Sequence, residues 1–131
     1  MLHDFLKQSL IMAQIPFSTD EPLAQKSTFK VGSSAPLFVK PYTTEQFRSA
    51  IGGATAAELP FFVLGGGSNV VFPDSPLEAV VISTQNLSQI TVIDKDDVDD
   101  NTLSEDTVLV NCKCGTPMQT FVNFCTNHNL S

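Results

Sequence analysis

Residues 60–72 have the sequence PFFVLGGGSNVVF, and this segment guides the interpretation of the whole chain. Pro60 precedes the run 61–64, a short all-apolar segment typical of a strand that is buried on both faces. Three consecutive glycines follow at once, and the apolar residues 70–72 then predict a second strand. Glycine loses more backbone freedom on folding than any other residue, so the three glycines require a structural or a functional reason.

Two explanations for the glycines at 65–67 remain open from the residues alone. One is a tight turn that requires a positive φ. The other is an anion site, because bare backbone N–H groups can form a concave nest for phosphate, and Ser68 and Asn69 add side-chain donors. The glycines lead into neither Lys-Ser/Thr nor a helix, so the P-loop and the dinucleotide fingerprint do not apply. No Lys or Arg occurs between Arg48 and Lys95, which favours a diphosphate held by dipoles over a transferred phosphoryl group.

The segments around this loop predict alternating strands and helices. Apolar residues at helical spacing predict a helix over residues 3–14, and residues 16–36 are expected to form an extended connection. A strand is predicted at 37–40 and a helix at 44–58, where Thr43 and Gln46 have capping-box spacing and the glycines at 52–53 allow a break. With further strands at 61–64 and 79–82, this order predicts a parallel crossover unit.

The last third of the chain predicts a hairpin and a helix. Strands are expected at 89–93 and 108–110, on either side of an acidic stretch at 94–106 that is typical of a solvated loop. A helix is predicted to begin with Thr116 as its cap, Pro117 in its first turn and Gln119 reaching back. Its apolar face repeats at residues 118, 121, 122 and 125, and His128 fits its fraying end better than a catalytic base.

Composition and charge limit the possible partners. The chain has 131 residues, 42% of them hydrophobic, which suits one modest core. Seven acidic residues against one lysine at 94–106 account for most of the net charge of -7, and no basic cluster exists, so we expect no nucleic-acid partner. The three cysteines predict neither a disulfide framework nor a metal site. Without a basic secretory start or an apolar run of about 20 residues, we expect a cytoplasmic protein that does not contact membranes.

Several stretches of the sequence resemble one known family. They are Ser27-Thr28-Phe29, Gly32 and Pro36 before the first predicted strand, the segment 64–70, and the ending His128-Asn129-Leu130-Ser131. Over residues 20–131 the chain resembles the amino-terminal part of the UDP-N-acetylenolpyruvoylglucosamine reductases, also called UDP-N-acetylmuramate dehydrogenases. The resemblance implies an α+β fold, the FAD-binding domain of the FAD-linked oxidase (PCMH) type. It further implies a small parallel βαβ subdomain at 20–86 and the start of a second α+β subdomain at 87–131, which follow the N-terminal helix and connection expected at 1–19.

The resemblance also implies a cofactor and the residues that bind it. The diphosphate of FAD is expected to lie on Gly65, Gly66, Gly67, Ser68 and Asn69. The implied reaction belongs to peptidoglycan precursor synthesis: NADPH reduces the flavin, hydride passes to the enolpyruvyl group of a UDP-sugar, and a protein acid supplies a proton.

The resemblance leaves part of the family's machinery unaccounted for. The catalytic Arg, Ser and Glu of the family lie beyond the matched part, so no catalytic residue is assigned here. We expect a truncated piece without the substrate domain, inactive alone and prone to self-association. A non-catalytic nucleotide-binding or assembly module, or another FAD-linked oxidase, remains an alternative. Ser27 stands where the family usually has Asn, and Ser33 and Ser34 stand where a second Gly is common; we interpret these departures as surface variation.

Overall fold

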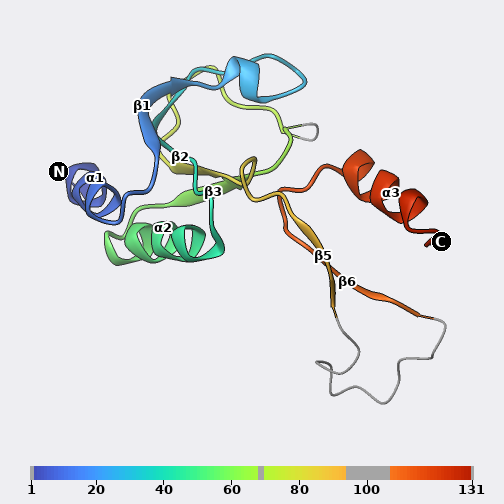
Figure 1. Cartoon of the computed structure of the whole chain (residues 1–131). Helices are drawn as coiled ribbons and strands as arrows, with labels where there is room; N and C mark the ends of the chain where they lie inside the picture. Colours follow the sequence, from blue (N-terminus) through green and yellow to red (C-terminus); the bar gives the residue numbers. More distant parts are fainter. Residues whose placement is uncertain (1, 68–69, 94–106, 131) are drawn as a thin grey trace. The chain divides into compact units, whose positions relative to one another are not determined.

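The computed structural model describes residues 2–67, 70–93 and 107–130. The chain folds as two units, a larger one at Met1–Leu87 and a smaller one at Ser88–Ser131 (Figure 1). The larger unit contains the glycine loop, and the smaller unit contains the hairpin and the last helix. The assignment of these units to two cofactor-binding subdomains stays a prediction.

A four-stranded mixed sheet forms the centre of the larger unit, in the order β1-β2-β4-β3. Its strands are β1 (Phe17–Pro22), β2 (Ser34–Val39), β3 (Phe61–Leu64) and β4 (Val80–Ser83). The strands β2, β4 and β3 run parallel, whereas β1 pairs antiparallel with β2. The predicted parallel crossover between residues 37 and 64 is therefore confirmed, but β4 lies between the two strands that it joins.

Strand β1 lies in the stretch that was predicted to be only an extended connection. Its sequence FSTDEP is mostly polar, and it pairs with β2 from Phe17 opposite Val39 to Pro22 opposite Ser34. A short 3-10 turn, Ala24–Lys26, follows it. The extended backbone was predicted correctly and the pairing was missed, because a polar edge strand has little of the apolar periodicity that identifies strands.

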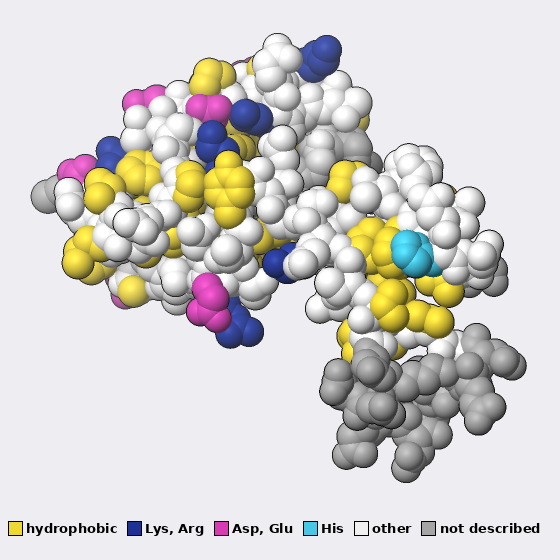
Figure 2. All heavy atoms as spheres, in the orientation of Figure 1, with side chains coloured by type: hydrophobic (Ala, Val, Ile, Leu, Met, Phe, Trp, Pro, Cys, Tyr) yellow, Lys and Arg dark blue, Asp and Glu magenta, His cyan; other side chains and the backbone are white. Residues whose placement is uncertain are grey.

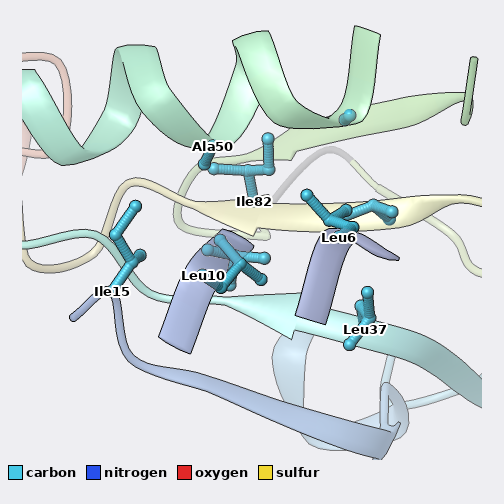
Figure 3. Close-up of a cluster of buried hydrophobic side chains, with 9 residues drawn as sticks. Leu6, Leu10, Ile15, Leu37, Ala50 and Ile82 are labelled. Carbon is cyan, nitrogen blue, oxygen red and sulfur yellow. The ribbon is translucent and has the colours of Figure 1, made fainter. Parts of the chain in front are cut away.

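Two helices, α1 (Leu2–Met12) and α2 (Thr44–Ala56), pack against one face of this sheet. Both were predicted, at 3–14 and 44–58. Leu6 and Leu10 of α1 meet Ala50 of α2 and Ile82 of β4 in a buried cluster (Figure 3). Each fully buried Leu or Ile stabilises the fold by roughly 1.5 to 3 kcal/mol, so this cluster holds both helices to the sheet.

Helix α2 begins as its local signals indicate. The Thr43 hydroxyl accepts a hydrogen bond from the Gln46 N–H at 3.0 Å, and Gln46 Oε1 accepts from the Tyr42 N–H at 2.7 Å. The predicted cap is thus confirmed. The helix continues through its two glycines, and a Cβ on Gly53 would lie 2.9 Å from Leu6 Cδ1. A methyl group at this position would require the Leu6 side chain to shift.

Two predictions about the segment 60–72 are wrong. Strand β3 is not buried on both faces: three of its four residues are 38% to 39% exposed, because β3 is an edge strand and β4 takes the interior position. Residues 70–72 form no strand. Phe72 is instead buried with Phe38 and Val81 in a second cluster. Val81 points away from its neighbours in β4, which face the helices, so this cluster lies on the other face of the sheet.

The smaller unit holds the predicted hairpin and helix. Strands β5 (Ile90–Ile93) and β6 (Leu109–Cys112) pair antiparallel, and α3 (Met118–Asn127) follows. The acidic stretch 94–106 lies outside the described residues. None of the described residues of this unit is buried, and apolar side chains reach its surface (Figure 2). The smaller unit therefore has no enclosed core among those residues.

The start of α3 differs from the prediction. Thr116 does not cap the helix, because its hydroxyl accepts from the Gln89 N–H at 3.1 Å, a contact that spans 27 residues of sequence. Pro117 precedes the helix without a capping side-chain bond, and Gln119 Nε2 donates to Asn123 Oδ1 at 2.9 Å rather than reaching back. A tertiary contact has overridden the local capping pattern.

Candidate cofactor-binding site

The glycine loop leaves the sheet at the end of β3. The Leu64 carbonyl accepts hydrogen bonds from the Thr84 N–H at 3.0 Å and from the Thr84 hydroxyl at 3.3 Å, so the chain is tied to the end of β4 up to this point. Leu64 lies opposite Ser83 in the last pair of the ladder, and Gly65 follows directly. The loop thus starts at the carboxyl edge of the parallel strands, which is the edge where open α/β sheets bind ligands.

Gly67 has a structural reason to be glycine. Its φ is +82°, in the left-handed region that other residues avoid, and the residue is buried. A Cβ at this position would overlap the Lys26 carbonyl oxygen and would lie 3.1 Å from Ser27 Cα. Gly67 therefore fits the first explanation for the glycines, a turn with positive φ.

Gly65 and Gly66 differ from Gly67 in both respects. Their φ angles lie outside the left-handed region, and no heavy atom of the described residues comes within 4 Å of a Cβ built on either glycine. Both residues are exposed. The packing of the described residues does not require glycine at these positions. The open space beside their backbone is what the second explanation, an anion cradle, needs.

A segment far away in the sequence packs on this loop. The Thr28 N–H donates to the Gly67 carbonyl at 3.0 Å, and the Ser27 hydroxyl donates to the Val70 carbonyl at 2.7 Å, across 43 residues of sequence. Ser27 is only 5% exposed, so its interpretation as surface variation is wrong. Sequence reasoning identified both segments by resemblance but could not pair them, because neither has a local pattern that indicates contact with the other.

Two other serines at which the chain departs from the family lie in the larger unit, before and at the start of β2. Ser33 and Ser34 are half-buried, and the Ser33 N–H donates to the Pro73 carbonyl at 3.0 Å. Ser68 and Asn69 lie outside the described residues, so their role in binding stays a prediction.

Lys26 carries a cation on the segment that contacts the loop, but a carboxylate already pairs with it. Its Nζ lies 3.2 Å from Glu21 Oε1 and 5.0 Å from the centre of the Phe38 ring. Burial raises the pKa of Glu21, but hydrogen bonds from Ser18 and Lys26 and the Lys26 charge outweigh it and hold the pKa of this carboxyl below its usual value. The charge of Lys26 is therefore already balanced by a carboxylate.

The cysteines and His128 occupy ordinary positions in the smaller unit. Cys112, Cys114 and Cys125 are free thiols, and no group of three or more His, Cys, Asp or Glu within the described residues could hold a metal ion. His128 Nδ1 lies 2.9 Å from the Phe124 carbonyl oxygen, and its ring stacks on the Phe124 ring at a centroid distance of 4.1 Å. No helix in the part of the chain that the structure describes has the length and apolar character needed to cross a membrane.

Comparison with known proteins identifies the family to which this chain belongs. Residues 35–131 match the family described as the FAD binding domain, and the chain belongs to that family. FAD is accordingly its cofactor. A solved structure supports the fold: a solvent-stable cholesterol oxidase superposes with a TM-score of 0.63 over 88% of this chain and 21% of that one, at 13% identity. The predicted α+β fold of the FAD-linked oxidase type is confirmed.

Curated relatives specify the branch of the family that the chain resembles. The UDP-N-acetylenolpyruvoylglucosamine reductase of Treponema pallidum (strain Nichols) is 28% identical over 109 residues, which are 83% of this chain and 28% of the relative. The reductase of the same name from Syntrophobacter fumaroxidans (strain DSM 10017 / MPOB) is 29% identical over 119 residues, 91% of this chain and 33% of the relative. The resemblance predicted from the sequence is confirmed. The chain spans about a quarter to a third of the length of these relatives.

Proposed function

We propose that the glycine loop of this chain forms the wall that binds the diphosphate of FAD. The observation that carries the proposal is the difference among the three glycines. Gly67 is required by its φ and its contacts, whereas Gly65 and Gly66 border open space and have no such requirement. A ligand that approaches the bare backbone explains glycine at these two positions, and the family to which the chain belongs supplies the ligand.

The residues of the chain would act on the cofactor through backbone groups. The N–H groups of Gly65 and Gly66 would donate to phosphate oxygens, while Gly67 holds the bend that presents them. Ser68 and Asn69 are proposed to add side-chain donors, as the sequence suggests. A linked diphosphate suits this arrangement because it is bound, not transferred, and needs no charge clamp of the kind used in phosphoryl transfer.

We further propose that the chain is the amino-terminal FAD-binding part of a reductase that uses NADPH to reduce UDP-N-acetylglucosamine enolpyruvate to UDP-N-acetylmuramate. The names of its curated relatives support this proposal. Bound FAD supplies the hydride chemistry of such a reaction. No residue of this chain is assigned to proton donation or to substrate binding, so the chain alone is proposed to be inactive.

Calorimetric titration of the purified chain with FAD, ADP and UDP tests the binding proposal. We expect saturable FAD binding that ADP competes for, since the two ligands share the adenosine diphosphate group. Gly66→Leu fills the open space and is expected to weaken FAD binding about tenfold or more. Gly52→Leu is the matched control, because Gly52 is also exposed, has no atom within 4 Å of a built Cβ and lies in α2.

Two outcomes would contradict the binding proposal. An equal effect of the leucines at 66 and 52 on FAD affinity would place the cofactor elsewhere. Saturable binding of ADP or UDP by a chain that shows no binding of FAD would favour a non-catalytic nucleotide-binding module. The proposed inactivity has its own test: turnover of the enolpyruvyl sugar nucleotide by the purified chain with FAD and NADPH, without any added partner, would contradict it.

A further inference from the structure

We propose that Ser27 is a positioning residue that fixes the glycine loop in the shape that binds the cofactor. This inference rests on the proposed function of the loop. It assigns a role to a side chain outside the loop, on a segment that precedes β2. Ser27 would touch no ligand and would act through the backbone groups that it holds.

The hydrogen bonds around Ser27 connect both sides of the loop to one segment. On the near side, the Thr28 N–H donates to the Gly67 carbonyl at 3.0 Å. On the far side, the Ser27 hydroxyl donates to the Val70 carbonyl at 2.7 Å. The same hydroxyl oxygen accepts from the Phe29 N–H at 3.1 Å, which fixes the direction of its own proton. A single buried hydroxyl thus joins the far side of the loop to the segment that holds its near side.

The hydroxyl of Ser27 both donates and accepts a hydrogen bond, which a residue that only fills space would not need. A serine hydroxyl has one proton to donate and two lone pairs to accept with, and here the proton and one lone pair are engaged. Because Ser27 is 5% exposed, removing the hydroxyl would leave the Val70 carbonyl and the Phe29 N–H without this partner in a place that water reaches poorly. The Thr28 bond would then hold the loop from one side only.

The consequence for binding is a matter of preorganisation. A loop that is already anchored on both sides loses little conformational freedom when a ligand arrives, so less of the interaction free energy is spent on ordering it. Ser27 has φ -131° and ψ 148°, an extended conformation that β-branched residues also favour. Threonine can therefore supply the same hydroxyl from the same backbone, and the pair of alanine and threonine variants separates the hydroxyl from the rest of the side chain.

Two measurements on Ser27→Ala and Ser27→Thr test this role. The first is the amide hydrogen exchange of Thr28, expressed relative to the amide of buried Val81 in the same protein so that a change in global stability cancels. It is expected to accelerate about tenfold in Ser27→Ala and to return in Ser27→Thr. The second is the FAD dissociation constant, which is expected to rise about tenfold in Ser27→Ala and to recover in Ser27→Thr.

The control variant is Ile15→Val. Ile15 is buried in the cluster between the helices and the sheet (Figure 3), so this change lowers stability from a site in that cluster. It is expected to leave both the relative Thr28 exchange and FAD affinity unchanged.

The outcomes separate this inference from the proposed function. Unchanged relative exchange of Thr28 in Ser27→Ala overturns the positioning role, whether or not the chain binds FAD. Accelerated exchange with unchanged FAD affinity also overturns it, because the loop would then bind without being held. If exchange accelerates in Ser27→Ala but the wild-type chain does not bind FAD, the proposed function is overturned and with it the cofactor part of this inference.

Discussion

Replacing Gly67 by alanine tests the division of the glycine loop most directly. Alanine must adopt the left-handed conformation that Gly67 has at φ +82°, at a cost of about 1 to 2 kcal/mol. Its Cβ would also overlap the Lys26 carbonyl oxygen and lie 3.0 Å from the Lys26 carbonyl carbon. These are backbone atoms that cannot turn aside as a side chain would, so relief requires a local backbone shift at about 1 to 3 kcal/mol. The total loss of stability is expected to be about 2 to 5 kcal/mol.

Gly66→Ala is the comparison within the same loop. The added methyl group meets open space and the φ of Gly66 is outside the left-handed region, so the free energy of unfolding is expected to change by less than about 0.5 kcal/mol. Its methyl group occupies the space proposed for the diphosphate, so FAD binding is expected to weaken. The two variants should therefore separate stability from binding.

Urea unfolding followed by far-ultraviolet circular dichroism measures the free energy of unfolding of each variant, and calorimetry with FAD measures its affinity for the cofactor. Unfolding slopes of wild type and variants must agree, so that a shift in midpoint reports stability. If Gly67→Ala and Gly66→Ala destabilise the chain equally, the assignment of one glycine to the fold and the other to the ligand is refuted.

Three further predictions concern other parts of the larger unit. The folded-state pKa of Glu21 is below its ordinary value of 4.5. The stability that Glu21 contributes is therefore present above that value and is lost as pH falls through the folded pKa. Glu21→Gln should remove this part of the acid sensitivity in unfolding measurements between about pH 6 and pH 3. Val63→Lys adds a charge to the exposed edge strand β3 and should reduce self-association in analytical ultracentrifugation, whereas a wild-type chain that stays monomeric at high concentration would count against this edge. Gly52→Ala, in a helix interior with open space, should raise the free energy of unfolding by about 0.5 to 1 kcal/mol, and Gly53→Ala, whose methyl group meets Leu6, should not reproduce that gain.

The helices of the larger unit could be predicted because their signals are local. Thr43 and Gln46 are three residues apart, and the Thr43 hydroxyl accepts from the Gln46 N–H as this spacing indicates, while the Gln46 side chain accepts from the N–H of Tyr42, one residue before the cap. The same reasoning failed at Thr116, which has an equally good capping pattern. Its hydroxyl bonds to Gln89, and no window of neighbouring residues contains that partner.

The burial of β3 could not be predicted, because burial depends on the order of strands in the sheet. The run at 61–64 is entirely apolar, and its composition alone indicates an interior strand. Strand β4, which follows it in the sequence, takes the position between β2 and β3 and leaves β3 at the edge. The composition of a strand indicates whether it is suited to burial, whereas its position in the sheet depends on how the other strands pair.

The sequence predicts the three glycines as one motif, but in the structure Gly67 has a different environment from Gly65 and Gly66. Three identical residues in sequence have no feature that distinguishes them, so a tight turn and an anion cradle were alternatives for the whole run. In the fold, Gly67 is buried against the backbone of Lys26 and Ser27, while Gly65 and Gly66 face open space. The turn explanation therefore holds for Gly67, and the anion cradle remains the proposal for Gly65 and Gly66.

This division also determines which substitutions can reveal the ligand. A change at Gly67 damages the fold first, so a loss of binding there says little about what the loop contacts. A change at Gly65 or Gly66 adds atoms only to the open side, and the chain keeps its internal hydrogen bonds from Thr28 and Ser27. If such variants remain as stable as wild type and still bind FAD with the same affinity, no steric reason is left for glycine at these positions, and the backbone cradle must be abandoned.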